Sequence, residues 1–123
     1  MILLDTNAVI WLLVSHPRAA TLLAGPERLA LSPVSLLELQ FLAEVGRIQL
    51  APGHVVESIA VDQRWRVDSP SVRALCEAAL PIGWTRDPFD RLLAAHALLR
   101  HWPLATGDRR LIAHLGPGAT IAL

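Results

Sequence analysis

The chain has 123 residues and no formal net charge at pH 7, with 11 basic and 11 acidic side chains. Its hydrophobic content of 53% and charged content of 18% are typical of a globular protein and exclude an intrinsically disordered one. The length predicts a single domain over residues 1–123 with one substantial core. The absence of net charge excludes an overall basic field, so any binding to nucleic acid would depend on a local patch.

The sequence also indicates a cellular setting. No stretch reaches the roughly 18 apolar residues of a membrane-spanning helix, and the apolar start, Ile2–Leu4, is too short for a signal peptide. Cys76 is the only cysteine, so the chain cannot form an internal disulfide. These features predict a cytoplasmic protein that has no membrane association.

The first seven residues contain the first functional signal. Ile2, Leu3 and Leu4 form a continuous apolar run, which is typical of a buried strand in a parallel sheet. Asp5 follows at the carboxyl end of that strand, where ligands bind in open α/β sheets. The alternative is that Asp5 only caps the following helix, and this stretch alone leaves both readings open.

Short apolar runs typical of strands alternate along the chain with segments of helical spacing, separated by proline and glycine steps. The expected helices cover residues 6–14, 17–24, 33–45, 53–62, 69–80, 88–99 and 109–115. The expected strands cover residues 2–4, 28–32, 47–50, 64–67, 103–106 and 119–123. This alternation predicts an α/β fold with a parallel sheet and crossover connections.

Four acidic residues fall at comparable positions in this predicted fold. Two follow a strand, one opens a buried helix and one lies within the helix after the second strand; they are Asp5, Asp108, Asp90 and Glu38. A cluster of carboxylates is unfavourable unless a cation lies among them. Mg²⁺ and Mn²⁺ prefer oxygen ligands, so the pattern predicts a metal site suited to phosphodiester hydrolysis. Asp62 and Asp68, in polar turn-like segments, are expected to be ordinary surface charges.

The segment Asp87-Pro88-Phe89-Asp90 indicates different roles for its two carboxylates. A proline at the first helical position makes Asp87 the N-cap and Asp90 the third residue of the helix. Asp87 is therefore expected to bind the free amides at the helix start, with a supporting role at the metal as the alternative. Asp90 is expected at the metal site, with a capping-box role as the alternative.

The sequence lacks the motifs of several other kinds of catalytic or binding site. The sequence contains no cysteine and histidine spacing typical of zinc, no phosphate-binding glycine pattern and no nucleophile elbow. His96 and His101 are five positions apart and do not share a helix face. A metal-dependent phosphomonoesterase would need a second aspartate two positions after Asp5, where Asn7 stands instead. A non-catalytic protein-binding module is the other alternative.

Four segments, in this order, carry a family resemblance: Leu3-Leu4-Asp5-Thr6-Asn7, Ser35-Leu36-Leu37-Glu38-Leu39, Arg86–Ala97 and Ala105-Thr106-Gly107-Asp108. Together they resemble the PIN-domain family, and most closely the VapC-type toxins of bacterial toxin–antitoxin pairs. The resemblance covers essentially the whole chain. Its most specific part is the Asp-Pro-Phe-Asp-Arg run followed by Thr-Gly-Asp.

The resemblance implies a three-layer α/β/α sandwich on a central parallel sheet and a Mg²⁺- or Mn²⁺-dependent endoribonuclease. It also implies a homodimer and a cognate antitoxin that blocks the site. The family's catalytic acidic residues correspond to Asp5, Glu38, Asp90 and Asp108, with Asp5, Asp90 and Asp108 as metal ligands. Positions beside the site or the RNA correspond to Thr6, Asn7, Asp87, Arg91 and Thr106. The four arginines next to acidic positions, which are expected either to meet phosphates or to be ordinary surface charges, are Arg86, Arg91, Arg109 and Arg110.

The apolar content, with four tryptophans, exceeds what a domain of this size is expected to bury. Two predicted helices carry apolar side chains beyond one face: Trp11 and Leu12 on the first, and Leu36, Leu39 and Leu42 on the helix over 33–45. We expect these helices to form a groove for an amphipathic antitoxin helix. Packing against a second copy of the chain is the alternative.

Overall fold

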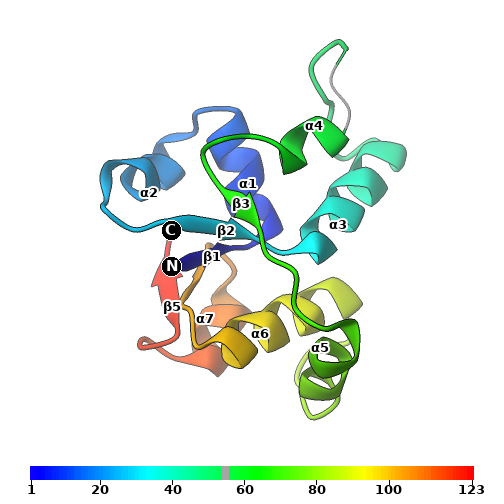
Figure 1. Ribbon diagram of the computed structural model, residues 1–123, viewed down its shortest axis with the longest axis vertical. Coiled ribbons are helices and arrows are strands. Elements are labelled where there is room, and N and C mark those ends of the chain that lie inside the picture. The colour runs from blue at the N-terminus through cyan, green and yellow to red at the C-terminus, as the bar shows by residue number, and fades with distance from the viewer. Residues whose placement is uncertain (54–55) are drawn as a thin grey trace.

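The computed structural model describes residues 1–53 and 56–123 (Figure 1). Its strands are β1 (Ile2–Leu4), β2 (Leu29–Leu31), β3 (Arg66–Val67), β4 (Leu104–Thr106) and β5 (Thr120–Ala122). Its helices are α1 (Thr6–Leu13), the 3₁₀ helix η1 (Pro17–Ala19), α2 (Ala20–Ala24), α3 (Pro33–Glu44), α4 (Val56–Ala60), α5 (Val72–Ala79), α6 (Pro88–Arg100) and α7 (Arg109–Leu115). No helix within the described residues is long and apolar enough to cross a membrane.

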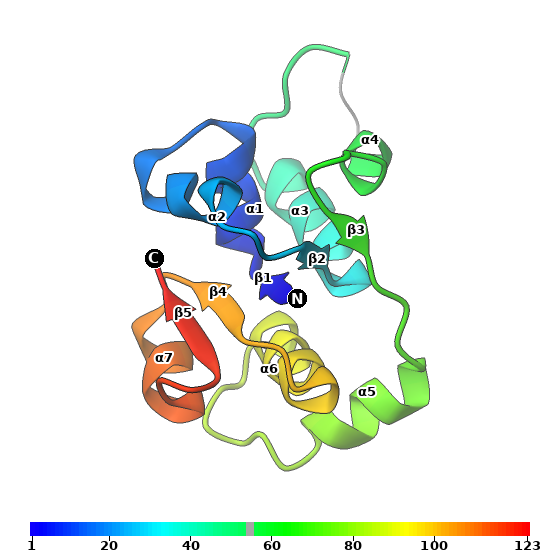
Figure 2. The ribbon, with the colours of Figure 1, turned by 60° about the vertical axis from the view of Figure 1, so that its left-hand side comes forward.

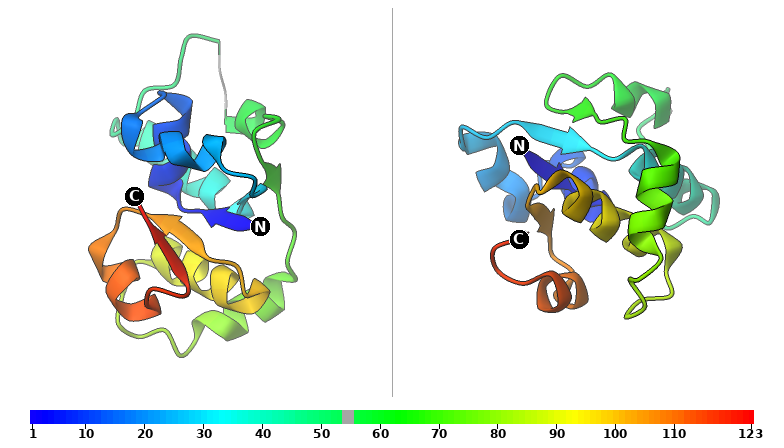
Figure 3. Two further views of the ribbon diagram at one scale, coloured as in Figure 1. Left: turned by 90° about the vertical axis from the view of Figure 1, so that its left-hand side faces the viewer. Right: turned by 60° about the horizontal axis from the view of Figure 1, so that its bottom comes forward.

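All five strands are parallel and lie in the order β3-β2-β1-β4-β5. Helices α1 to α4 cover one face of the sheet and α5 to α7 cover the other (Figures 2 and 3). This arrangement confirms the predicted three-layer α/β/α sandwich. The strand order runs outward in both directions from the β1–β4 pair, so the crevice for a ligand is expected at the carboxyl ends of these two strands.

The core explains why β1 is apolar at every position. Alternate residues of a strand point to opposite faces of the sheet. Leu4 packs on the side of α1 and α3, whereas Leu3 packs on the side of α6, and both are fully buried. A central strand covered on both faces has no solvent-facing position for a polar side chain. The first polar residue, Asp5, follows directly after the strand.

The helices begin where short polar side chains bind free backbone amides, which is the ordinary means of starting a helix. Among the described residues, the α-helices with such a cap and their capping residues are α1 (Asp5), α3 (Ser32), α5 (Ser71), α6 (Asp87) and α7 (Asp108). Three of the five are aspartates from the predicted site region. Helix formation therefore fixes these carboxylates in place.

Three predicted elements differ from the structure. Residues 47–50 do not form an extended segment, because the amides of Arg47 and Ile48 bond back to the carbonyl of Leu42 and close the end of α3. Helix α5 begins at Val72 with Ser71 as its cap, not at residue 69. The predicted helix over 53–62 is shorter, since α4 covers Val56–Ala60; Val55, one of its expected apolar positions, lies outside the described residues.

The predicted groove residues are partly wrong as well. Leu12 and Leu39 are 2% and 0% exposed, so both belong to the core. The outward face of α3 instead carries Leu37, Phe41 and Val45, which are 64%, 47% and 50% exposed. The helix is turned this way because Ser35, on the same side as Leu39, is hydrogen-bonded across to α1.

A buried polar network joins α6 to the sheet and to α3, and it shows that Asp68 is not an ordinary surface charge. His96 has no solvent exposure; its Nε2 lies 2.8 Å from Asp68 Oδ2 and its Nδ1 lies 2.9 Å from Ser32 Oγ. Arg100 also donates to Asp68, at 2.7 Å. Burial lowers the pKa of His96 although the bond to Asp68 opposes this. A neutral ring with its proton on Nε2 donates to Asp68 and accepts from Ser32.

The network predicts that Asp68→Ala lowers the free energy of unfolding by roughly 1–3 kcal/mol, because the buried His96 Nε2–H loses its acceptor. Chemical denaturation at pH 7.5 measures this. The control is Glu77→Ala, since Glu77 pairs only with the exposed Arg73 on α5 and should contribute less than about 0.5 kcal/mol. Equal effects of the two substitutions would contradict a structural role for the network.

Candidate active site

The predicted site residues meet in one cavity at the carboxyl ends of β1 and β4. Its lining residues come from β1, α1, α3, α6 and α7 and are Asp5, Thr6, Asn7, Glu38, Leu42, Asp90, Leu93, Asp108 and Leu111. The cavity has a volume of about 40 Å³, which is room for a small cation and a few water molecules. All four carboxylates from the predicted acidic set therefore border the same small space.

Asp5 and Asp108 are held by the helices that follow them. Asp5 Oδ1 accepts the amide of Ala8 at 2.6 Å, and Asp108 Oδ1 accepts the amides of Arg110 and Leu111 at 2.8 and 3.1 Å. The two readings of Asp5 are thus compatible, because it caps α1 and also lines the cavity. Each carboxylate lies at a helix start, where the macrodipole favours negative charge.

Thr106 connects these two aspartates. Its hydroxyl oxygen accepts the amide of Asp108 at 3.0 Å, and its hydroxyl group hydrogen-bonds to Asp5 and thereby favours the ionised form of that carboxyl. Thr106 is completely buried at the end of β4. A single side chain between β1 and β4 therefore holds Asp5 and Asp108 in register.

Glu38 is fixed by a second hydroxyl pair. The Thr6 hydroxyl donates to Glu38 Oε1, and the Thr6 oxygen lies 3.1 Å from the hydroxyl oxygen of Ser35. Ser35 was not among the predicted site residues, although it precedes Glu38 by three positions and so lies on the same helix face. The first turn of α1 and the first half of α3 together determine where the Glu38 carboxylate lies.

Asp87 and Asp90 have the different roles that their spacing indicates. Asp87 Oδ1 accepts the amides of Phe89 and Asp90 at 2.8 and 3.3 Å, so it is the cap of α6. Asp90 lies in the first turn of α6, half-buried, and lines the cavity. The negative charge of Asp87 also acts on Asp90 and Glu38, so the cap contributes to the electrostatics of the site.

The carboxylates are close enough to disturb one another's ionisation. Burial and then repulsion from neighbouring carboxylates raise the pKa of Asp90 to about 7. Burial raises the pKa of Asp5 to about 6, with smaller contributions from the charges of Glu38 and Asp108. Burial also raises the pKa of Glu38. Within the described residues, no ion pair includes any of the four carboxylates, so the chain supplies no cation to the cluster.

The donor set suits a hard divalent cation, because every charged group at the cavity is a carboxylate and the remaining donors are hydroxyl and amide groups. Among the described residues, no three acidic, histidine or cysteine side chains already converge at ligand distance. Asp5 and Asp108 turn an oxygen to the amides that they cap. Each still has a second carboxylate oxygen that caps no helix amide in the structure.

The structure changes the expectation for one arginine. The guanidinium group of Arg91 donates to the carbonyls of Ala79 and Leu80 at 3.2 and 3.1 Å, where it satisfies free carbonyls at the end of α5. Arg91 does not line the cavity, so its phosphate contact stays a prediction without support from the cavity geometry. Arg86, Arg109 and Arg110 are exposed beside α6 and α7, and none of the ion pairs in the described part of the chain includes them.

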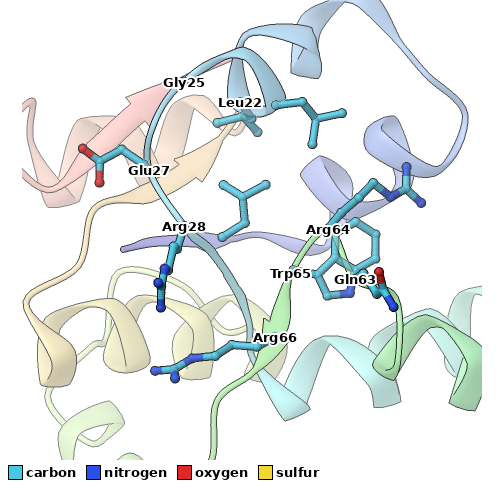
Figure 4. A pocket seen from close by; sticks show the side chains of 10 residues that line it. Leu22, Gly25, Glu27, Arg28, Gln63, Arg64, Trp65 and Arg66 are labelled. Atoms are coloured by element: carbon cyan, nitrogen blue, oxygen red, sulfur yellow. The ribbon is translucent and has the colours of Figure 1, made fainter.

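A larger pocket, of about 400 Å³, lies at the opposite edge of the sheet between α2 and β3. Figure 4 shows Arg28, Arg64 and Arg66 around it together with Trp65. Arg64 is already paired with Asp62, and the pocket contains no part of the carboxylate cluster. By volume this pocket exceeds the carboxylate cavity, but the perturbed carboxylates identify the smaller cavity as the candidate active site.

Comparison with known proteins agrees with this fold. The family model described as "PIN domain" matches residues 2–116. The protein named Ribonuclease VapC22, from Mycobacterium tuberculosis (strain ATCC 25618 / H37Rv), is 36% identical over 122 residues, which cover 94% of this chain and 93% of the relative. The chain therefore belongs to the PIN-domain family.

Solved structures give the same fold. A toxin–antitoxin complex from Klebsiella pneumoniae contains a chain that superposes with a TM-score of 0.72 at 20% identity, covering 99% of this chain and 97% of that one. The VapBC2 complex from Rickettsia felis, bound to a promoter DNA fragment, gives a TM-score of 0.68 at 21% identity, covering 100% and 99%. At these identities the likeness concerns the fold.

The raised pKa of Asp90 predicts a pH-dependent gain from Asp90→Asn. In the unfolded chain an aspartate ionises near its ordinary pKa of 3.8. Above pH 7 Asp90 is ionised in the folded protein as well, and its charge in the cavity lowers the free energy of unfolding. This penalty disappears as the pH falls through 7 towards 4. At pH 8 without divalent metal, Asp90→Asn should be more stable than the parent by at least about 1 kcal/mol.

Urea unfolding in EDTA between pH 5 and 8 measures this difference, which should shrink at the acid end. The control is Glu77→Gln, which removes an exposed carboxylate of α5. A stability gain for Asp90→Asn that does not depend on pH would contradict the electrostatic explanation.

Proposed function

We propose that this protein is a metal-dependent endoribonuclease and acts as the VapC-type toxin of a toxin–antitoxin pair. The observation that carries the proposal is a cavity lined by four carboxylates, none of which has a cationic partner among the described residues. The name of the 36%-identical relative, a ribonuclease, supports RNA as the substrate. We place the protein in the cytoplasm, where RNA is available.

In this proposal Asp5, Asp90 and Asp108 hold Mg²⁺ or Mn²⁺ between the starts of α1, α6 and α7. When bound, such a cation would stabilise the charge on the attacked phosphate and make a water molecule more acidic. Asp90 must lose its proton before it can act as a ligand, so its raised pKa makes metal binding weaker at acid pH.

Glu38 has a different task. Its carboxylate is held by the Thr6 hydroxyl and faces the cavity from α3, across from α6 and α7. We propose that it accepts a hydrogen bond from the attacking water and so orients it towards phosphorus. Asn7 is exposed at the same cavity and offers an amide group to the substrate.

The phosphate backbone of the RNA would meet the arginines beside the cavity. Arg86 precedes the cap of α6, and Arg109 and Arg110 form the first turn of α7. Their guanidinium groups are suited to phosphate oxygens. Because the whole chain is uncharged, we attribute RNA affinity to this local group and not to a long-range field.

Asp5→Asn and Asp90→Asn should each lower the rate of RNA cleavage by at least about 100-fold, because the loss of a ligand weakens metal binding more than the loss of a supporting contact. Asparagine retains a side-chain oxygen that can cap α1, so Asp5→Asn should remain folded. Cleavage of total RNA with added Mn²⁺ or Mg²⁺ measures the rate, and thermal melting reports the fold. Undiminished cleavage in EDTA, or by either variant, would refute the mechanism.

The partners are also proposed. An apolar groove of about 440 Å³ lies between α1, residues 48–51 and α4, and its apolar lining includes Ile10, Leu13, Val14 and Ile59. We propose that the groove receives an amphipathic helix of a cognate antitoxin, because it borders α1, whose first turn lines the catalytic cavity. We propose that the outer face of α3, which carries Leu37, Phe41 and Val45, packs on a second copy of the chain.

Two exposed residues separate these surfaces. Val14→Glu should lower antitoxin binding at least about 10-fold without changing the protein's own oligomeric state, because burying an unpaired charge is unfavourable. Leu37→Glu should convert a dimer to a monomer and leave antitoxin binding intact. Both side chains are about two-thirds exposed, so neither change should disturb the core. Light scattering measures the oligomeric state, and pull-down of the co-expressed pair measures antitoxin binding. If Val14→Glu broke the dimer and Leu37→Glu weakened antitoxin binding, the two surfaces would have the opposite partners.

A further inference from the structure

Gly107, in the turn between β4 and α7, is packed more closely than any other glycine of the described residues. A Cβ atom at this position would lie 2.6 Å from Trp11 Cη2 and 2.8 Å from Arg18 Nη2. Its backbone is not in the left-handed region that favours glycine. The requirement for glycine is therefore steric, and it comes from the side chain of Trp11 on a helix more than 90 positions away in the sequence.

Trp11 has little freedom to move away from this turn. The guanidinium carbon of Arg18 lies 4.3 Å from the ring centroid, and His16 stacks on the ring at a centroid distance of 5.6 Å. Arg18 Nη2 also donates to the carbonyl of Leu123 at 2.6 Å. The amide of Leu123 in turn donates to the carbonyl of Thr106 at 3.0 Å. These contacts form a closed ring from α1 through η1 and the end of β5 back to the Gly107 turn.

The contact joins α1 and α7, two of the three helices that are capped by aspartates. Asp5 begins α1, the helix that contains Trp11, and Asp108 follows Gly107 and begins α7. The Thr106 hydroxyl is the polar connection between Asp5 and Asp108. The Trp11–Gly107 contact is a second, apolar connection on the other side of the same turn.

We propose that Trp11, braced by Arg18, is a positioning residue for Asp108: the indole ring fixes the turn at Gly107 and so sets where the Asp108 carboxylate lies relative to Asp5. The consequence for metal binding rests on the proposed nuclease function. The geometric part does not, since the ring, the turn and the cap of α7 are all contacts within the metal-free chain.

The test uses a clash and its relief. Gly107→Ala pushes the turn away from Trp11, and the double variant Gly107→Ala/Trp11→Leu removes the far end of the ring and makes room for the new methyl group. Gly118→Ala is the matched control for the first change, because nothing lies within 4 Å of a Cβ at that position. Trp65→Leu is the control for loss of an arginine-covered tryptophan, since the guanidinium carbon of Arg64 lies 4.8 Å from its ring centroid. Trp65 lines the other pocket (Figure 4) and not the carboxylate cavity.

The metal-free measurement is hydrogen exchange of the Arg110 and Leu111 amides, which Asp108 caps. In EDTA, their exchange should be faster in Gly107→Ala, should return towards the parent rate in the double variant, and should be unchanged in Gly118→Ala and Trp65→Leu. The second measurement is the dissociation constant for Mn²⁺ by calorimetry. It should rise about 10- to 100-fold in Gly107→Ala, as expected for a group that orients a ligand, and recover in the double variant.

Parent-like amide exchange in Gly107→Ala would overturn the proposal. Amide exchange in the double variant that is as fast as in Gly107→Ala would also overturn it. Equal loss of Mn²⁺ affinity in Trp65→Leu would also overturn it, because that result would reflect general destabilisation. A parent protein that neither binds Mn²⁺ nor cleaves RNA would instead refute the proposed function. The amide-exchange measurement would then still decide whether Trp11 positions Asp108.

Discussion

The repulsion among buried carboxylates is the constraint on which the rest of the structure depends. Four acidic side chains share one small cavity at the carboxyl edge of the sheet, and burial adds to the cost of their charges. The fold counters this cost with backbone amides: Asp5, Asp87 and Asp108 each cap a helix. The same bonds that start three helices hold negative charge at or beside the cavity, where repulsion between the carboxylates would otherwise move them apart.

The sheet makes this arrangement possible. Because β1 and β4 are neighbours and parallel, the residues that follow them lie side by side although about 100 positions separate them in sequence. Helices α3 and α6 then bring Glu38 and Asp90 from opposite layers of the sandwich. Hydroxyl groups complete the arrangement, since Thr6 bonds to Glu38 and Thr106 connects Asp5 with Asp108. These threonines act by orientation and add no charge.

Local sequence signals were sufficient for most of the fold and for the position of the acidic residues. The apolar run before Asp5, the capping pattern around Pro88 and the alternation of strands with helices each depend on neighbouring residues, and the structure has these elements. The rotation of α3 could not be predicted in this way. Leu37 and Leu39 are equally apolar, and it is the packing of α3 on α1, where Thr6 and Ser35 are hydrogen-bonded, that accompanies the burial of Leu39.

Long-range contacts explain the other differences. Arg91 lies next to a site aspartate in sequence, yet its guanidinium group reaches back to the end of α5. Gly107 looks like an ordinary turn residue until Trp11 is placed against it. Asp68 follows a two-residue strand, and nothing in its sequence neighbourhood indicates the histidine 28 positions later. Each of these depends on how elements pack, which residue spacing within one element does not specify.

The buried imidazole of His96 has one more consequence. Its ring is closed off from solvent, and its neighbours on both sides determine which nitrogen holds the proton. Exchange of a buried, hydrogen-bonded proton with water requires local opening, so its exchange rate reports on motions that expose this face of α6. The His96 Nε2 proton is therefore an intrinsic spectroscopic probe of local opening. It lies away from the cavity and needs no added label or substitution.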